Sequence, residues 1–197
     1  MGFNLEKGSS FNLSKEAPSM KMGGVGLGWT TEADLDVSAF CLGDDGHIVE
    51  RTDFVFYGSE NKTVLDGEDF PRPYTSCGGI YGAIDAPEGD DEDEGDDEDM
   101  WVYFERISEK IKEIVVVVTI HDSGVTFSDV SGCYCRIWDA DTEKELCKYV
   151  MSDDFSNEDA VEIGKFTRDV NGWQFTAIGK GHVGGLEALI KKFAYKF

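Results

Sequence analysis

GKFTRDVNGWQFTAIG (residues 164–179) decides the fold, because two strand-like runs flank Asn171-Gly172. The runs contain Phe, Thr, Trp and Ile, which favour strands, and Asn-Gly between such runs is the strongest short-range signal of a β-hairpin. A type I′ turn needs positive φ at both central residues, and Asn and Gly tolerate that conformation best. The sequence therefore predicts that these two strands pair across a tight turn at Asn171-Gly172.

The same pattern repeats along the chain. Short runs rich in Val, Ile, Phe and Tyr alternate with Gly, Asp and Asn, which is typical of an all-β sandwich. The predicted strands cover residues 23–29, 33–42, 53–58, 100–104, 113–121, 133–140, 144–151, 162–169 and 173–179. We expect an all-β dominated, two-sheet β-sandwich with a few short helices.

Two segments have helical spacing. Residues 104–114 place Phe and Ile three and four positions apart, which predicts a short helix before the Val-rich run. Residues 186–193 carry a Leu, Leu, Ile, Phe stripe, with Lys191 and Lys192 late in the segment, where cations suit the helix dipole. We expect this C-terminal helix to cover part of the sandwich.

The composition indicates one acidic domain. The chain has 197 residues, of which 41% are hydrophobic, enough for a substantial core, and a formal net charge of −22. Eleven of the 40 acidic residues lie between Asp85 and Asp99, so 29 acidic residues face 18 basic ones over the rest of the chain. Such a field repels nucleic acid and anionic membranes and concentrates cations, so we expect metal ions or basic proteins as partners and no nucleic acid.

Location and redox state follow from what the sequence lacks. No segment approaches the roughly 20 apolar residues of a transmembrane helix, and the start MGFNLEKGSS has no apolar core of a secretory signal. The five cysteines show no paired spacing, and four of them lie in strand-like runs. We therefore expect a cytoplasmic protein with reduced thiols.

The predicted strand ADLDVSAFCL (33–42) presents carboxylates on one face. A strand period of two places Asp34, Asp36 and Ser38 on one side and the apolar residues on the other. Two carboxylates about 7 Å apart repel each other unless water or a cation lies between them. The alternatives are a metal-binding strand and an ordinary solvent-facing one.

The acidic run DAPEGDDEDEGDDED (85–99) also allows two interpretations. Blocks of like charge usually remain solvated, but Ca²⁺ takes six to eight oxygen ligands, and such a run supplies them in abundance. It is not an EF-hand, because with Gly95 at loop position six the bidentate Glu position would be Trp101. A calcium site here must combine separate segments. Zinc is disfavoured because the His and Cys residues lack ligand spacing.

Catalytic motifs are weak. His121-Asp122 follows a buried-looking strand, but without a nucleophile elbow a structural histidine is the better interpretation. GGVGLGW (23–29) lacks the third glycine of a dinucleotide fingerprint, so it predicts a strand of small residues that another backbone approaches closely. We expect no enzyme.

Taken together, these segments resemble the TerD family of tellurite-resistance and stress-response proteins nearly end to end. The matching stretches are LEKGSSFNLSKEAP (5–18), VGLGW (25–29), ADLDVSAFCL (33–42), TDFVFYG (52–58), GDDED (95–99), VVTIHD (117–122), GKFTRDVNGWQFTAIGKG (164–181) and GGLEAL (184–189). The resemblance implies one domain over residues 1–197, with a long acidic metal-binding loop within residues 59–99.

The resemblance also implies that the sandwich binds calcium, typically two ions. Carried over by position, the ligands are Asp34, Asp36, Asp85, Glu94, Gly95, Asp96, Asp97 and Glu98. The loop departs from the family pattern, since Glu94 stands where the family has Asp and Asp93 where it has Gly. Residues 61–80 form a longer segment than the family pattern implies.

The resulting hypothesis is a calcium-binding, non-catalytic stress-response scaffold or sensor that binds protein partners, with peripheral association to membrane complexes. One alternative is a structural protein whose acidic loop is a solvated arm for basic partners, with no specific metal. A remote alternative, drawn from some relatives in the family, is a cyclic-nucleotide-binding protein.

Overall fold

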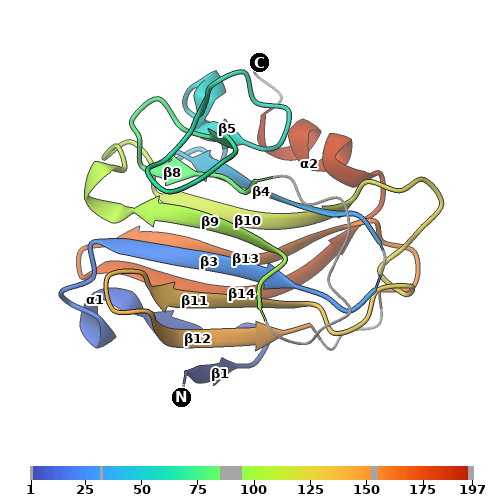
Figure 1. The fold of residues 1–197 in the computed structure, drawn as a ribbon, viewed down its shortest axis with the longest axis horizontal. Helices are drawn as coiled ribbons and strands as arrows, with labels where there is room; N and C mark the ends of the chain where they lie inside the picture. Colours follow the sequence, from blue (N-terminus) through green and yellow to red (C-terminus); the bar gives the residue numbers. More distant parts are fainter. Residues whose placement is uncertain (1, 32, 85–94, 152–154, 195–197) are drawn as a thin grey trace.

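The computed structural model describes residues 2–31, 33–84, 95–151 and 155–194, and these form two packed β-sheets (Figure 1). The first sheet has the strand order β1-β12-β11-β3-β9-β8, and the second has β2-β14-β13-β10-β4-β5. A small third sheet pairs β6 with β7. The expected two-sheet β-sandwich is confirmed.

The bounds of the elements follow in sheet order. The first sheet contains β1 (Phe3–Leu5), β12 (Lys144–Val150), β11 (Tyr134–Asp139), β3 (Met22–Gly28), β9 (Glu98–Tyr103) and β8 (Ile80–Tyr81). The second contains β2 (Ser10–Asn12), β14 (Gly172–His182), β13 (Ala160–Asp169), β10 (Glu113–Ile120), β4 (Leu35–Leu42) and β5 (Phe54–Val55). The remaining elements are β6 (Lys62–Thr63), β7 (Arg72–Pro73), the α-helices α1 (Leu13–Glu16) and α2 (Gly185–Phe193), and the 3₁₀ helices η1 (Arg51–Asp53) and η2 (Phe104–Arg106).

The middle of the second sheet is buried on both faces, which explains the uninterrupted run of valines in β10. Its inner face packs into the main core between the sheets. On its outer face, Phe40, Val115 and Val117 form a second cluster with Leu189 and Phe193 of α2. The predicted C-terminal helix is thus confirmed, and its apolar stripe covers the outer face of this sheet.

The hairpin predicted from Asn171-Gly172 is confirmed, but its type I′ turn is wrong. Asp169 pairs with Gly172, so the two loop residues are Val170 and Asn171. Gly172 has a φ of 106°, whereas Glu143 is the one non-glycine residue with positive φ in the described ranges. The Asp169 carboxylate accepts a hydrogen bond from the Asn171 backbone N at 2.6 Å, an Asx turn that moves the bend by one residue.

The helix predicted over residues 104–114 is also wrong. The segment forms the 3₁₀ turn η2, and β10 already begins at Glu113. Ile107 and Ile111 are buried from this irregular connection. The Arg168 guanidinium donates hydrogen bonds to the carbonyls of Ile107 at 3.0 Å and Ser108 at 3.2 Å. A distant side chain therefore satisfies backbone groups that a helix would have paired internally.

The glycines of β3 make room for side chains. An added Cβ would lie 2.1 Å from Trp138 at Gly24, 2.0 Å from the Asp96 carboxylate at Gly26 and 2.5 Å from the Tyr134 ring at Gly28. The close approach predicted for this strand therefore exists, but side chains make it, not a second backbone.

The five cysteines are free, as expected. Cys41, Cys133, Cys135 and Cys147 are buried, and Cys77 is exposed. Burial raises the pKa of the Cys133 and Cys147 thiols to about 12. These buried thiols therefore stay protonated at neutral pH. No helix in the described part of the chain combines the length and the apolar character needed to cross a membrane.

Gly24→Ala tests the close packing on β3. We expect it to lower the free energy of unfolding by about 1–3 kcal/mol, because the new methyl group overlaps the Trp138 ring. The control is Gly23→Ala, whose Cβ would lie 3.0 Å from the edge of the Phe104 ring. Both changes stiffen the unfolded chain alike. Equal urea midpoints for the two variants would contradict the packing argument.

A buried carboxylate at η1 predicts a pH dependence. The Asp53 side chain accepts a hydrogen bond from the Glu50 backbone N at 2.9 Å, and burial raises the pKa of its carboxyl to about 6. The folded state therefore holds the proton more tightly than the unfolded state. This contribution to stability is fully present below about pH 4 and is lost as the pH rises through about 6.

Asp53→Asn should remove that pH dependence. Above pH 6 we expect the variant to be more stable than the parent by on the order of 1–3 kcal/mol, with the difference shrinking toward pH 4. Urea unfolding at pH 4.5, 6 and 7.5 measures it. A difference between the two proteins that stays constant with pH would contradict the raised pKa.

Candidate functional site

Four of the eight residues predicted to bind metal, Asp34, Asp36, Asp97 and Glu98, lie at one end of the sandwich. There β3 ends next to the start of β9, with Leu27 paired to Glu98, and β4 begins next to the end of β10, with Leu35 paired to Ile120. Figure 1 shows these strand ends in the right half of the view. We call this region the acidic end.

Glu98 joins the two sheets at the acidic end. Its side chain is buried, and its Oε2 accepts a hydrogen bond from the Val37 backbone N at 2.6 Å. Val37 lies on β4 of the second sheet, where β5 pairs only with Ala39 and Phe40. The carboxylate therefore satisfies a backbone donor on a strand edge that β5 does not reach.

Asp97 fixes the end of β3. Its backbone N donates to the Leu27 carbonyl at 2.8 Å, and its Oδ2 accepts from the Trp29 backbone N at 2.7 Å. The Trp29 indole in turn donates to the Ala33 carbonyl at 3.0 Å. Asp97 thus holds the start of the β3–β4 connection in place.

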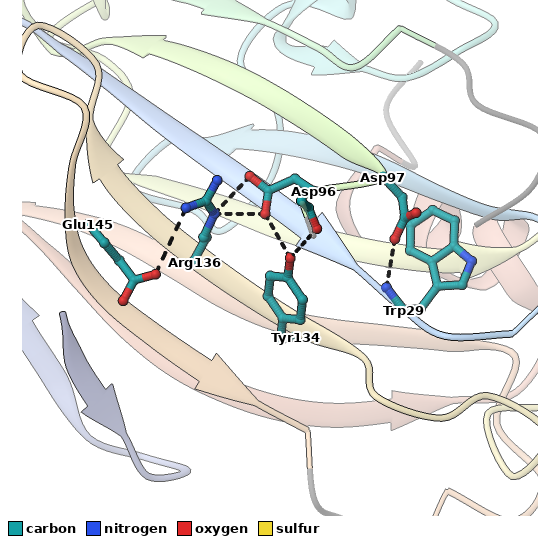
Figure 2. Close-up of polar contacts among 7 residues, drawn as sticks. Trp29, Asp96, Asp97, Tyr134, Arg136 and Glu145 are labelled. Carbon is teal, nitrogen blue, oxygen red and sulfur yellow. Dashed lines mark hydrogen bonds and ion pairs between the residues drawn. The ribbon is translucent and has the colours of Figure 1, made fainter. Parts of the chain in front are cut away.

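Asp96 lies on the outer face of the first sheet, against β11 (Figure 2). Both of its carboxylate oxygens accept from Arg136 Nε, at 2.7 and 2.9 Å, and Tyr134 donates to it at 3.1 Å. Tyr134 also donates to the Gly95 carbonyl. The hydrogen bond from Arg136 to Asp96 raises the pKa of the guanidinium, whereas burial, with Asp96 as a second cause, raises the pKa of Tyr134. Asp96 therefore has a structural cation as its partner.

The two carboxylates of the β4 region lie next to the end of β10. Asp36 is 5% exposed and faces Thr119 across the ladder. Asp34 Oδ2 is 3.1 Å from His121 Nδ1, and this hydrogen bond, with the charge of Asp36, raises the pKa of His121. Asp34 Oδ1 is buried and has no hydrogen-bond partner within the described residues.

The solvent-facing alternative for this strand is wrong. Asp36 and Ser38 share a face, as the strand period predicts, but both are buried. The neighbouring residues on that face, Phe40 and Leu42, belong to the cluster covered by α2. Burial makes the Asp36 carboxylate costly unless donors or a cation satisfy it, whereas Asp34 is half-buried.

The predicted ligands fall into three groups. Asp34, Asp36, Asp97 and Glu98 lie at the acidic end; Gly95 and Asp96 turn toward β11; Asp85 and Glu94 lie outside the described residues. Within the described ranges, no three His, Cys, Asp or Glu side chains form a group that could hold a metal ion. A complete metal site would need donors from outside those ranges.

Sequence reasoning missed Arg136 and His121 as partners of the acidic residues. Arg136 carried no local signal, because a single arginine in CYCRIWDA fits an ordinary strand. The place of His121 next to Asp34 follows from the antiparallel pairing of β4 with β10. Both contacts join residues more than 35 positions apart.

The structure defines an acidic β-sandwich in which the Glu98 carboxylate links both sheets at one end. A model of the TerD domain matches residues 1–193, and the chain belongs to the TerD family. It is 35% identical over 202 residues to "Tellurium resistance protein TerD" of Serratia marcescens, covering 98% of this chain and 97% of that protein. It is 34% identical over 200 residues to "General stress protein 16U" of Bacillus subtilis (strain 168), covering 94% of each.

Solved structures show the same fold. A homologue of telluride resistance protein (TerD) from Streptomyces coelicolor A3(2) superposes with a TM-score of 0.65 at 22% identity, covering 88% of this chain and 96% of that one. At this identity the likeness concerns the fold alone.

Glu98→Ala tests the link between the sheets. We expect it to lower the free energy of unfolding by about 2–3 kcal/mol, because the Val37 N–H loses its buried acceptor. Glu98→Gln keeps an acceptor of the same size and should cost less. Urea unfolding in the presence of a chelator measures both variants without any contribution from bound metal. Equal losses for Ala and Gln would contradict the role of this hydrogen bond.

Proposed function

We propose that this protein binds Ca²⁺ at the acidic end and acts as a non-catalytic scaffold or sensor in a stress response. The observation that carries the proposal is the Asp34 carboxylate, whose Oδ1 is buried without a hydrogen-bond partner among the described residues. A buried carboxylate oxygen with no donor costs free energy, and a bound cation would offset that cost.

The donor chemistry fits calcium. The residues proposed to contribute ligands, Asp34, Asp36, Asp97 and Glu98, offer carboxylate oxygens, the ligand type that Ca²⁺ prefers, and residues outside the described ranges would complete the set. Two of these carboxylates already accept backbone hydrogen bonds, which fixes their position. Asp85 and Glu94 remain predicted ligands outside the described residues, and two ions remain the predicted number. Asp96 remains a predicted ligand for which Arg136 competes.

Calcium would act mainly by restricting the movement of the strand ends at the acidic end. Asp34 and Asp36 belong to the second sheet and its β3–β4 connection, whereas Asp97 and Glu98 lead into β9 of the first. Ions bound by these carboxylates would hold the strand ends of both sheets in place and neutralise part of the −22 charge. The calcium-bound surface would then bind a protein partner in the cytoplasm, including partners in membrane-associated complexes.

The names of the relatives support a stress role, since they refer to tellurium resistance and general stress. A non-catalytic role agrees with the surroundings of His121. Its described partners are the Asp34 carboxylate and the Tyr57 ring, and neither is a nucleophile poised for catalysis.

Calorimetric titration with CaCl₂ tests the proposal. We expect saturable binding well below millimolar concentration, and a stabilisation of about 2.7 kcal/mol at a calcium concentration 100 times the dissociation constant. The double variant Asp34→Asn, Asp36→Asn should lose most of the binding. Heat of binding and the shift in melting temperature are independent measurements of the same event.

The control is the double variant Asp44→Asn, Asp45→Asn, which makes the same change in charge in the connection after β4. It should bind calcium like the parent. Equal weakening in both double variants would show that diffuse negative charge, not a site, attracts the cation. Absence of binding below millimolar calcium, with the acidic loop still open to a nonspecific protease, would favour the solvated arm for basic partners.

A further inference from the structure

A cavity of about 300 Å³ lies where α2, the η1–β5 segment and the chain around residues 58–61 meet. Figure 1 shows α2 and the segment between β5 and β8 along the upper edge of the molecule. None of the residues proposed to bind calcium lines this cavity. Its volume is at the lower end of the range typical of small-molecule sites, about 300–1,000 Å³.

Aromatic rings form one wall of the cavity. The rings of Phe54 and Phe56 stack with centroids 4.4 Å apart, and Phe54 stacks in turn on the buried Phe40 at 4.3 Å. Tyr74, in the segment between β5 and β8, lines the cavity and stacks on Tyr81. Because these rings are held by one another, the wall is preformed and suits a flat, unsaturated ligand.

The rim of the cavity carries a cation that has no partner among the described residues. Arg51 is exposed, and its guanidinium makes no hydrogen bond or ion pair with any other residue in the described ranges. Acidic residues outnumber basic ones by 40 to 18 in this chain, so a free arginine at an aromatic cavity is unusual here. A guanidinium presents a planar fork of donors that matches a carboxylate.

Two other polar groups at the cavity, Ser59 and Thr52, are already engaged in hydrogen bonds. Ser59 Oγ accepts from the Phe56 backbone N at 3.1 Å, and Thr52 Oγ1 donates to Ser76 at 3.0 Å. Glu60 also lines the cavity and would repel an anion. Arg51 is therefore the group that would select the charge of a ligand, and Glu60 opposes it.

We propose that this cavity binds a small aromatic carboxylate, with the ring against Phe56 and Tyr74 and the carboxylate at Arg51. Calcium binding plays no part in this site, so the two proposals stand independently. The charge selection follows from Arg51, and the shape selection follows from the stacked rings.

Titration with 2-naphthoate, in the presence of a chelator, tests the cavity. We expect saturable one-to-one binding below millimolar concentration, and at least about tenfold weaker binding of the neutral analogue 2-naphthylmethanol. Arg51→Gln should weaken naphthoate binding by about tenfold or more and leave naphthylmethanol binding unchanged. Glu60→Gln should strengthen naphthoate binding, because it removes a repelling charge.

The matched control is Arg106→Gln, which makes the same change in charge in the other 3₁₀ helix, η2. It should leave naphthoate affinity unchanged. Phe56→Leu should weaken both ligands, with folding of each variant verified by circular dichroism. Equal losses in Arg51→Gln and Arg106→Gln, equal affinity for the acid and the alcohol, or no saturable binding below millimolar concentration would each overturn the proposal.

Discussion

The hydrogen bond from the Val37 backbone to the Glu98 carboxylate is the constraint on which the acidic end depends. It joins a strand edge in the second sheet to the first residue of a strand in the first sheet. A buried carboxylate is tolerated only when donors satisfy it. If the start of β9 shifted along β3, the Glu98 carboxylate and the Val37 N–H would both lose their hydrogen-bond partner. This contact therefore fixes the position of the C-terminal part of the acidic run.

On either side of Glu98, neighbouring carboxylates point in different directions. Successive side chains of a strand point to opposite faces, so Glu98 enters the interior while Asp99 points outward to Arg72. Asp97 meets the backbone at the end of β3, and Asp96 lies over Gly26 in contact with Arg136. A stretch that is uniform in charge is therefore not uniform in function, because each carboxylate meets different donors.

Local and periodic signals predicted much of the fold, and long-range contacts decided the rest. The β13–β14 pairing, the alternation in β4 and the stripe of α2 are each encoded within one short stretch of sequence. The helix predicted before β10 failed because Arg168, about 60 positions away, supplies its carbonyls with donors. At the candidate site, the shared face of Asp34 and Asp36 was predictable. The burial of Asp36 was not predictable, because the layers around that face come from distant segments.

One strand face connects the two proposed sites. Asp36 and Ser38 are followed on the outer face of β4 by Phe40. The Phe40 ring stacks on Phe54, which stacks on Phe56 in the cavity wall. From that wall, contacts run from Phe56 to Tyr57 at 5.4 Å, and from Tyr57 to His121 at 5.7 Å. His121 then contacts Asp34. Contiguity alone does not couple two sites; coupling needs an element with two arrangements that both ligands bias. Phe56 and Tyr57 are adjacent residues of one backbone, and the first contributes to the cavity wall while the second contacts His121 at the acidic end.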